Sequence, residues 1–185
     1  MYLKVITFAG SVLVSAGISS AWAQSVVYSD TKGKACKQLR YEDELSEFEC
    51  KGPAGQKVVF ADMGLMFGVQ FGKDAMKQPP FRAADKSIGD KIEWRLDATG
   101  KPYASILRIF VGEEFNPPKE PRTYQVLVVT KINGDEACHI AYVNARIPNA
   151  NARAAEIADS RATSFNCGSD APERIGNPAK LYEAD

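Results

Sequence analysis

Apolar and polar residues alternate along several stretches of this chain, the pattern of β-strands that bury one face. The alternation is clearest from Leu65 to Gly72 and from Ile92 to Asp97, where large apolar residues occupy every second position. Other stretches are almost continuously apolar. The stretches with strand character are 47–51, 57–62, 65–72, 92–97, 103–111, 123–132 and 137–145. The pattern therefore predicts about seven strands.

Turn residues separate these stretches and indicate that most neighbours form hairpins. Gly52-Pro53-Ala54-Gly55 lies between the first two, and Ala98-Thr-Gly100-Lys-Pro102 follows the strand that ends near Asp97. Asn133-Gly134, between the last two, is the strongest short-range hairpin signal. We therefore expect a mostly antiparallel sheet, which can be strongly curled.

One stretch has helical spacing instead. Between 150 and 165 apolar residues recur every three or four positions, with charged residues between them. Asn149 or Asn151 is placed to cap the start, and Gly168 to end the helix. Since its apolar stripe is mostly alanine, the helix is expected to approach its sheet closely. The predicted class is α+β, with one C-terminal helix packed on the sheet.

The four cysteines, Cys36, Cys50, Cys138 and Cys167, are even in number and lack metal-site spacing, which favours two disulfides. Eight strand residues after Cys138 travel roughly 26 Å at about 3.3 Å each. Sixteen helical residues travel back about 24 Å at about 1.5 Å each. A helix folded antiparallel onto its preceding strand thus returns Cys167 to Cys138. Cys36 and Cys50 then pair with each other.

The large apolar residues of the strands are expected to form the core, although a cavity for an apolar ligand would use the same residue types. They are Phe60, Leu65, Phe67, Val69, Phe71, Trp94, Leu96, Leu107, Ile109, Phe110, Val126, Leu127, Val128, Val129, Ile140 and Tyr142.

The first 23 residues have the three parts of a secretory signal peptide. Lys4 provides the positive charge, the chain is apolar or small from Val5 to Ile18, and Ala21-Trp22-Ala23 fits a cleavage site. The apolar run is short of the about 20 residues that a membrane-spanning helix needs. We expect residues 1–23 to be a signal peptide, 24–170 a single exported domain and 171–185 a loosely ordered tail. The location is then periplasmic or extracellular.

Composition excludes several classes of function. Lys and Arg total 23, as do Asp and Glu, so the chain lacks the basic excess expected of a nucleic-acid binder. A single histidine, His139, leaves no partner for a metal site or a serine triad, and we expect it to be structural. No nucleotide-binding motif is present, and we expect no cofactor and no metal.

Two proline-containing connections, 73–91 and 112–122, are the best candidates for a binding surface. Phe81 follows Pro79-Pro80 and Phe115 lies just before Pro117-Pro118. Lys77 and Arg82 belong to a small positive excess in the first connection. Exposed aromatic residues on stiffened loops suit partner recognition. These four residues are the partner-binding candidates, although solvated loop charge and aromatic rings tucked under as lids explain them equally.

The acidic pairs Glu113-Glu114 and Asp135-Glu136 are poor candidates for glycoside chemistry. Neighbouring residues of a strand point to opposite faces, so neither pair forms a catalytic dyad by itself. Elsewhere, Phe48-Glu-Cys50-Lys-Gly52 followed by a strand resembles the start of small periplasmic lysozyme-inhibitor domains. The resemblance covers only these residues and transfers no functional residue.

We therefore expect an exported non-enzymatic binding protein whose partner is an unknown protein or glycan of the cell envelope. Two alternatives stay open. The first is a carrier of small apolar ligands with a cavity in a curled sheet. The second is a carboxylate-dependent hydrolase of cell-wall or glycan material, which needs two carboxyl groups that converge in one cleft.

Overall fold

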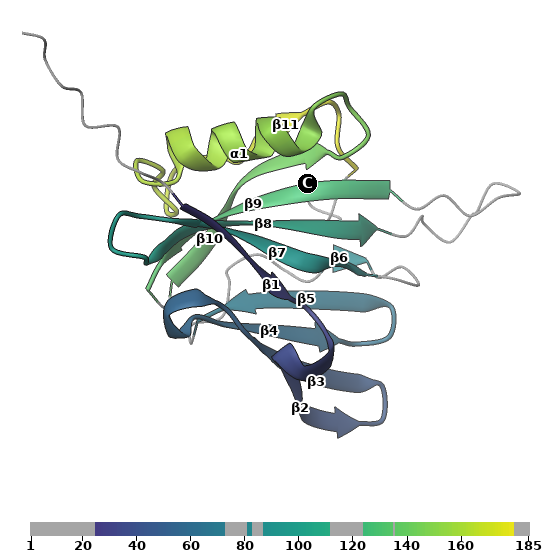
Figure 1. The fold of residues 1–185 in the computed structure, drawn as a ribbon. Helices are drawn as coiled ribbons and strands as arrows, with labels where there is room; N and C mark the ends of the chain where they lie inside the picture. Colours follow the sequence, from purple (N-terminus) through teal and green to yellow (C-terminus); the bar gives the residue numbers. More distant parts are fainter. Residues whose placement is uncertain (1–24, 73–80, 83–86, 112–123, 135, 180–185) are drawn as a thin grey trace, which may run out of the picture.

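The computed structural model describes residues 25–72, 81–82, 87–111, 124–134 and 136–179. Two short 3-10 turns and one α-helix accompany the strands (Figure 1). The elements are β1 (Ser25–Asp30), η1 (Gly33–Ala35), β2 (Cys36–Glu42), β3 (Leu45–Lys51), η2 (Pro53–Gly55), β4 (Lys57–Asp62), β5 (Met66–Phe71), β6 (Phe81–Arg82), β7 (Ile88–Leu96), β8 (Pro102–Val111), β9 (Tyr124–Asn133), β10 (Glu136–Asn144), α1 (Ala150–Arg161) and β11 (Glu173–Ile175).

The strands form two sheets. Sheet A has six strands in the order β1-β7-β8-β9-β10-β11, and sheet B has five in the order β2-β3-β4-β5-β6. Every neighbouring pair is antiparallel except β10 and β11, which are parallel. Because β1 pairs with β7, the chain begins at one edge of sheet A before it enters sheet B.

Sheet A is the middle of three layers, with α1 on one face and sheet B on the other (Figure 1). One core cluster joins sheets A and B, and its largest fully buried side chains are Trp94, Phe60 and Phe71. A second cluster joins sheet A to α1 through residues such as Ile140 and Ala154. The alanine stripe of α1 does allow a close approach, since Ala154 and Ala158 are fully buried.

The expectation of one strongly curled sheet of about seven strands is wrong. The seven predicted strands are present, but they belong to two stacked sheets that are not strongly curled. The physical reason lies in β8, β9 and β10, which have buried residues at successive positions and so bury both faces. A sheet apolar on both faces needs a layer on each side, and curling covers only one.

A glycine sets the closeness of the two sheets. Gly52, at the end of β3, lies under the indole of Trp94, where a β-carbon would come within 2.7 Å of Cζ2. The indole Nε1 donates a hydrogen bond to Ser29 Oγ at 2.8 Å, and the ring meets Phe71 edge-on with centroids 5.9 Å apart. Trp94 therefore joins β7 both to sheet B and to the edge strand β1.

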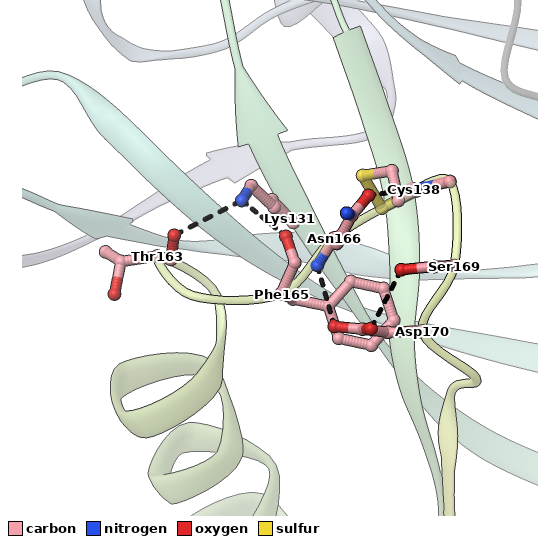
Figure 2. The surroundings of a disulfide bond; sticks show 9 residues. Lys131, Cys138, Thr163, Phe165, Asn166, Ser169 and Asp170 are labelled. Atoms are coloured by element: carbon pink, nitrogen blue, oxygen red, sulfur yellow. Dashed lines mark hydrogen bonds between the residues drawn. A yellow bond between two sulfur atoms is a disulfide. The ribbon is translucent and has the colours of Figure 1, made fainter.

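Both disulfide pairings predicted from chain geometry are confirmed. Cys138, in β10, is bonded to Cys167 beyond the end of α1, and Cys36 is bonded to Cys50, its direct partner across β2 and β3. Near the Cys138–Cys167 disulfide, Lys131 Nζ donates hydrogen bonds to the carbonyl oxygens of Thr163 and Phe165 (Figure 2). The C-terminal end of the helix is thus attached to sheet A by a covalent bond and by a lysine.

Two element boundaries differ from the sequence prediction. The helix ends at Arg161 rather than near residue 165, and turns follow it. Asn149 does occupy the N-cap position, with a left-handed φ of 57° and no side-chain cap hydrogen bond. Residues 173–175 of the expected loose tail form β11 beside β10. Among the described residues, no helix is long and apolar enough to cross a membrane.

Candidate functional site

Phe81, the aromatic residue expected to be exposed on the first proline-containing connection, is buried. Only 2% of its surface is accessible, and its ring packs against Phe67 with centroids 5.5 Å apart. The cause is β6, which pairs with β5 and places Phe81 directly opposite Phe67 in the core between the sheets. The interpretation of Phe81 as an exposed binding residue is therefore wrong.

The other partner-binding candidates are not brought together in the described chain. The backbone of Arg82 pairs with Met66 in sheet B. Lys77 and Phe115 lie outside the described residues, as does most of the connection 73–91 and all of 112–122. The role given to these two connections stays a prediction.

The single histidine is buried inside the protein. His139 is 5% exposed, and its Nδ1 lies 3.1 Å from the hydroxyl of Tyr142. Burial lowers the pKa of His139 to about 3, which keeps the ring neutral at physiological pH. Among the described residues, no three His, Cys, Asp or Glu side chains are grouped so that they could hold a metal.

The densest polar network lies between sheet A and α1 and is centred on Arg95. Its Nε donates to Asp159 Oδ1 at 2.8 Å, and its Nη1 donates to Glu93 Oε1 at 3.0 Å. Two tyrosines complete the network: Tyr103 donates to Asp159 at 2.6 Å and Tyr28 to Glu93 at 3.1 Å. Two carboxylates thus converge on one guanidinium.

These contacts determine the ionisation of the network. Burial lowers the pKa of Arg95, but hydrogen bonds and the charge of Asp159 outweigh it and raise that pKa above its usual value. Burial, followed by the hydrogen bond and charge of Asp159, raises the pKa of Tyr103 to about 12. Because Asp159 accepts from both Arg95 and Tyr103, it is poorly placed to act as a base. The network fastens α1 to β7 and β8.

The acidic pairs considered for hydrolysis give no dyad in the described chain. Glu136 is exposed at the start of β10, whereas Glu113, Glu114 and Asp135 lie outside the described residues. The convergence of Glu93 and Asp159 was not foreseen from the sequence, because 66 positions separate the two residues. Arg95 pairs with both carboxyl groups.

Seven large apolar side chains of the described residues are exposed, and four of them, including the two most exposed, belong to a different region. Tyr41 is 73% exposed, Leu65 67%, Leu39 47% and Met63 36%. All four belong to sheet B or to its β4–β5 turn, whereas the other three, Tyr28 at 62%, Val26 at 39% and Tyr124 at 38%, lie on sheet A. We call Leu39, Tyr41, Met63 and Leu65 the tip surface. Leu65 was predicted to be a core residue, and that prediction is wrong.

Strand register brings the tip surface together at one end of sheet B. Tyr41 is opposite Ser46, which is opposite Asp62, so Tyr41 and Asp62 are two strands apart, at about 10 Å. The turns β2–β3 and β4–β5 are neighbours at that end, since Glu44 Oε2 lies 3.8 Å from the β-carbon position of Gly64. In Figure 1 this end belongs to the part of the molecule farthest from α1.

The turn between β4 and β5 explains why Leu65 is exposed. Met63 N donates to Met66 O at 2.9 Å, which leaves Gly64 and Leu65 as the central residues of a tight turn. Gly64 has a φ of 73°, a conformation that side chains other than glycine rarely adopt. The end of Met63 folds back to within 3.7 Å of the Gly68 β-carbon position on the outer face of sheet B.

Sequence reasoning missed β2 and with it Leu39 and Tyr41. Nearly every residue of β2 is exposed, so the strand has no buried face and no alternation of apolar and polar residues. A β-bulge between Gln38 and Arg40 disturbs the period further. The available signal was two large apolar residues, Leu39 and Tyr41, within a run of charged ones.

Comparisons of the chain with protein-family models, with curated proteins and with solved structures gave no match. The tip surface therefore rests on the geometry described above.

Proposed function

We propose that this protein is an exported, non-enzymatic binding protein that recognises a protein partner through the tip surface. One observation carries the proposal: four apolar side chains are exposed at the same end of sheet B, with Tyr41 on the face that bears Phe67 and Met63 on the outer face. Contiguous exposed apolar patches on otherwise well-packed proteins mark interaction sites. Tyrosine and methionine, both present here, are enriched in the cores of protein interfaces.

Export is supported by the N-terminal pattern of residues 1–23 and by the two disulfides. Disulfides form and persist in oxidising compartments, which agrees with a periplasmic or extracellular location. Each bridge links residues separated by 14 or 29 positions and so restricts the unfolded chain.

A role without chemistry is supported by the state of the reactive side chains. The lone histidine is buried with a lowered pKa, and Glu93 and Asp159, whose carboxylates converge, share Arg95. These groups hold elements together, and their donors and acceptors are already engaged. The hydrolase alternative gains no support from them.

The apolar-ligand carrier is also less well supported than the binding protein. The large apolar side chains between the layers pack into two clusters, and α1 covers β8, β9 and β10 with buried alanines. A protein partner fits the tip surface better than a glycan, because Leu39, Met63 and Leu65 offer little or no hydrogen-bonding capacity to the hydroxyl groups of a sugar.

Site-specific photo-crosslinking in the native cells tests the proposal. A photoreactive phenylalanine derivative replaces Tyr41 in one strain and Tyr28, an equally accessible tyrosine at 62% exposure on sheet A, in a second. Position 41 is expected to give a discrete protein adduct, and position 28 is the matched control. Adding Leu65→Ser should reduce the adduct at position 41.

The outcomes separate clearly. A protein adduct from position 41 that is absent at position 28 and sensitive to Leu65→Ser supports the tip surface as the recognition site. The absence of any adduct at position 41, or equal adducts at both positions, contradicts it.

A further inference from the structure

The tip surface lies within the most acidic part of the described chain. Residues 39–47 and 61–65 contain five acids and one arginine, although the whole chain has equal numbers of acidic and basic residues. The acids are Glu42, Asp43, Glu44, Glu47 and Asp62. The charge around the exposed apolar side chains is therefore a local feature.

Four of these carboxylates form no ion pair with a described residue, and three of the four, Asp43, Glu44 and Asp62, lie in or beside the two turns. Arg40, the single base, engages Glu42 at 2.6 Å and leaves Asp43 and Glu44 in the adjacent turn without a counter-charge. Asp62 accepts a hydrogen bond from the backbone N–H of Gly64 at 3.1 Å, which fixes its carboxylate without neutralising it. All three lie at the two turns that border the tip surface.

Acidic residues elsewhere in sheets A and B show a different arrangement. Glu49, on the outer face of sheet B, is bridged by Lys37 and Lys57 at 3.4 and 3.0 Å. Glu93 is paired with Arg95, and Glu173 with Arg161. Glu136 and Asp97 also form no ion pair with a described residue, so the tip is distinguished by having three such acids at two neighbouring turns.

Charge restricts what can cover the tip surface. A second copy of this chain docked tip to tip would bring the same carboxylates together, and like charges at close range oppose association. Anionic lipid and nucleic acid would be repelled for the same reason. A partner with lysine and arginine side chains around an apolar patch would satisfy both the carboxylates and the four apolar residues.

We propose that the partner of the tip surface is a basic protein, held by apolar contacts with Leu39, Tyr41, Met63 and Leu65 and selected by Asp43, Glu44 and Asp62. This inference rests on the proposed function and specifies the partner of the same surface. The acids lie on the rim of the contact, where charge mainly controls the association rate and the choice of partner. Binding is therefore expected to weaken with salt.

A defined probe tests the inference on the purified protein. A peptide of alternating leucine and lysine supplies basic and apolar groups together, and a leucine–glutamate peptide of the same length is its charge-reversed control. The charge variant combines Glu44→Lys with Asp62→Asn, since an asparagine oxygen can still accept the Gly64 hydrogen bond. Glu136→Lys, at an exposed position on sheet A, is the control for charge alone.

The leucine–lysine peptide should bind the unmodified protein and the Glu136→Lys variant alike, and the charge variant should raise its Kd by about tenfold, since it changes three rim charge units. Raising the salt concentration should reduce this difference. Equal binding of the leucine–glutamate peptide, or an unchanged Kd in the charge variant, overturns the inference.

Failure of the inference is distinguishable from failure of the proposed function. If Tyr41→Ser weakens the complex crosslinked from position 39 while charge reversal and salt leave it unchanged, the tip surface binds a partner that is not basic. If Tyr41→Ser leaves the complex unchanged as well, the tip surface is not the recognition site.

Discussion

Sheet A and the free end of sheet B are both built from strands with large apolar residues, but these residues are buried in sheet A and exposed at the free end of sheet B. The central strands of sheet A are buried on both faces, by α1 and by sheet B. At the free end of sheet B, β2 is exposed along nearly its whole length, and the β4–β5 turn presents Leu65 to solvent. The same chain therefore buries large apolar residues in one region and leaves them accessible in the other.

The two regions also treat charge differently. On sheet A, Arg95 satisfies the carboxylates of Glu93 and Asp159, and Arg161 pairs with Glu173 beside α1. At the tip surface, Asp43, Glu44 and Asp62 have no ion pair with a described residue. Stability and recognition are thus separated in space, and this separation can be tested by substitution.

The largest effect is expected at the junction of the sheets. Trp94→Ala removes a fully buried indole and leaves a cavity between Gly52 and Phe71, which should lower the free energy of unfolding by about 3–5 kcal/mol. Denaturant unfolding followed by circular dichroism measures the change. A loss below about 1 kcal/mol would show that the two sheets do not depend on this contact.

An intermediate effect is expected from acidification. His139 has a folded-state pKa lowered to about 3, against 6.5 for the free side chain, so below pH 6.5 protons bind the unfolded chain preferentially. The contribution of His139 to the free energy of unfolding is fully present above pH 6.5 and is lost as the pH drops from 6.5 toward 3. Between pH 7 and pH 5 this residue should cost about 2 kcal/mol.

The variant His139→Gln isolates this contribution, because glutamine can still meet the hydroxyl of Tyr142 but does not titrate. Unfolding free energies of both proteins are measured at pH 7 and pH 5. From pH 7 to pH 5, the unfolding free energy of the unmodified protein should fall by about 2 kcal/mol more than that of His139→Gln. An equal pH dependence of the two proteins would mean that His139 is protonated in the folded state.

The sequence predicted sheet A and α1 well because burial imposes periods that can be recognised. Long apolar runs, the Asn133-Gly134 turn and the alanine stripe determined β8, β9, β10 and α1 closely enough for chain geometry to pair Cys138 with Cys167. Strands β1, β2, β6 and β11 were not predicted; the last two contain two and three residues, too few to show a period.

Leu65 and Phe81 show where pattern reasoning fails. Leu65 extends the alternation of Phe67, Val69 and Phe71, which predicts burial, but the Gly64 turn places it in solvent. Phe81 follows Pro79-Pro80, which predicts an exposed loop, but pairing with β5 places it in the core. The Leu65 outcome depends on the conformation of a local turn that interrupts the alternation, whereas the Phe81 outcome depends on pairing with another strand that the local pattern does not show.

The smallest effect on stability, and the largest on binding, is expected at the tip surface. Tyr41→Ser combined with Leu65→Ser removes two side chains that are 73% and 67% exposed, and the free energy of unfolding should change by less than about 1 kcal/mol, as for most surface substitutions. The double substitution should nevertheless abolish the crosslinked complex formed from the neighbouring position 39.

Parallel measurement of unfolding free energy and crosslinking yield in this double variant is the most direct test of the separation between stability and recognition. The account predicts unchanged stability together with a lost complex. A complex that persists, or a loss of stability comparable with that of Trp94→Ala, would contradict it.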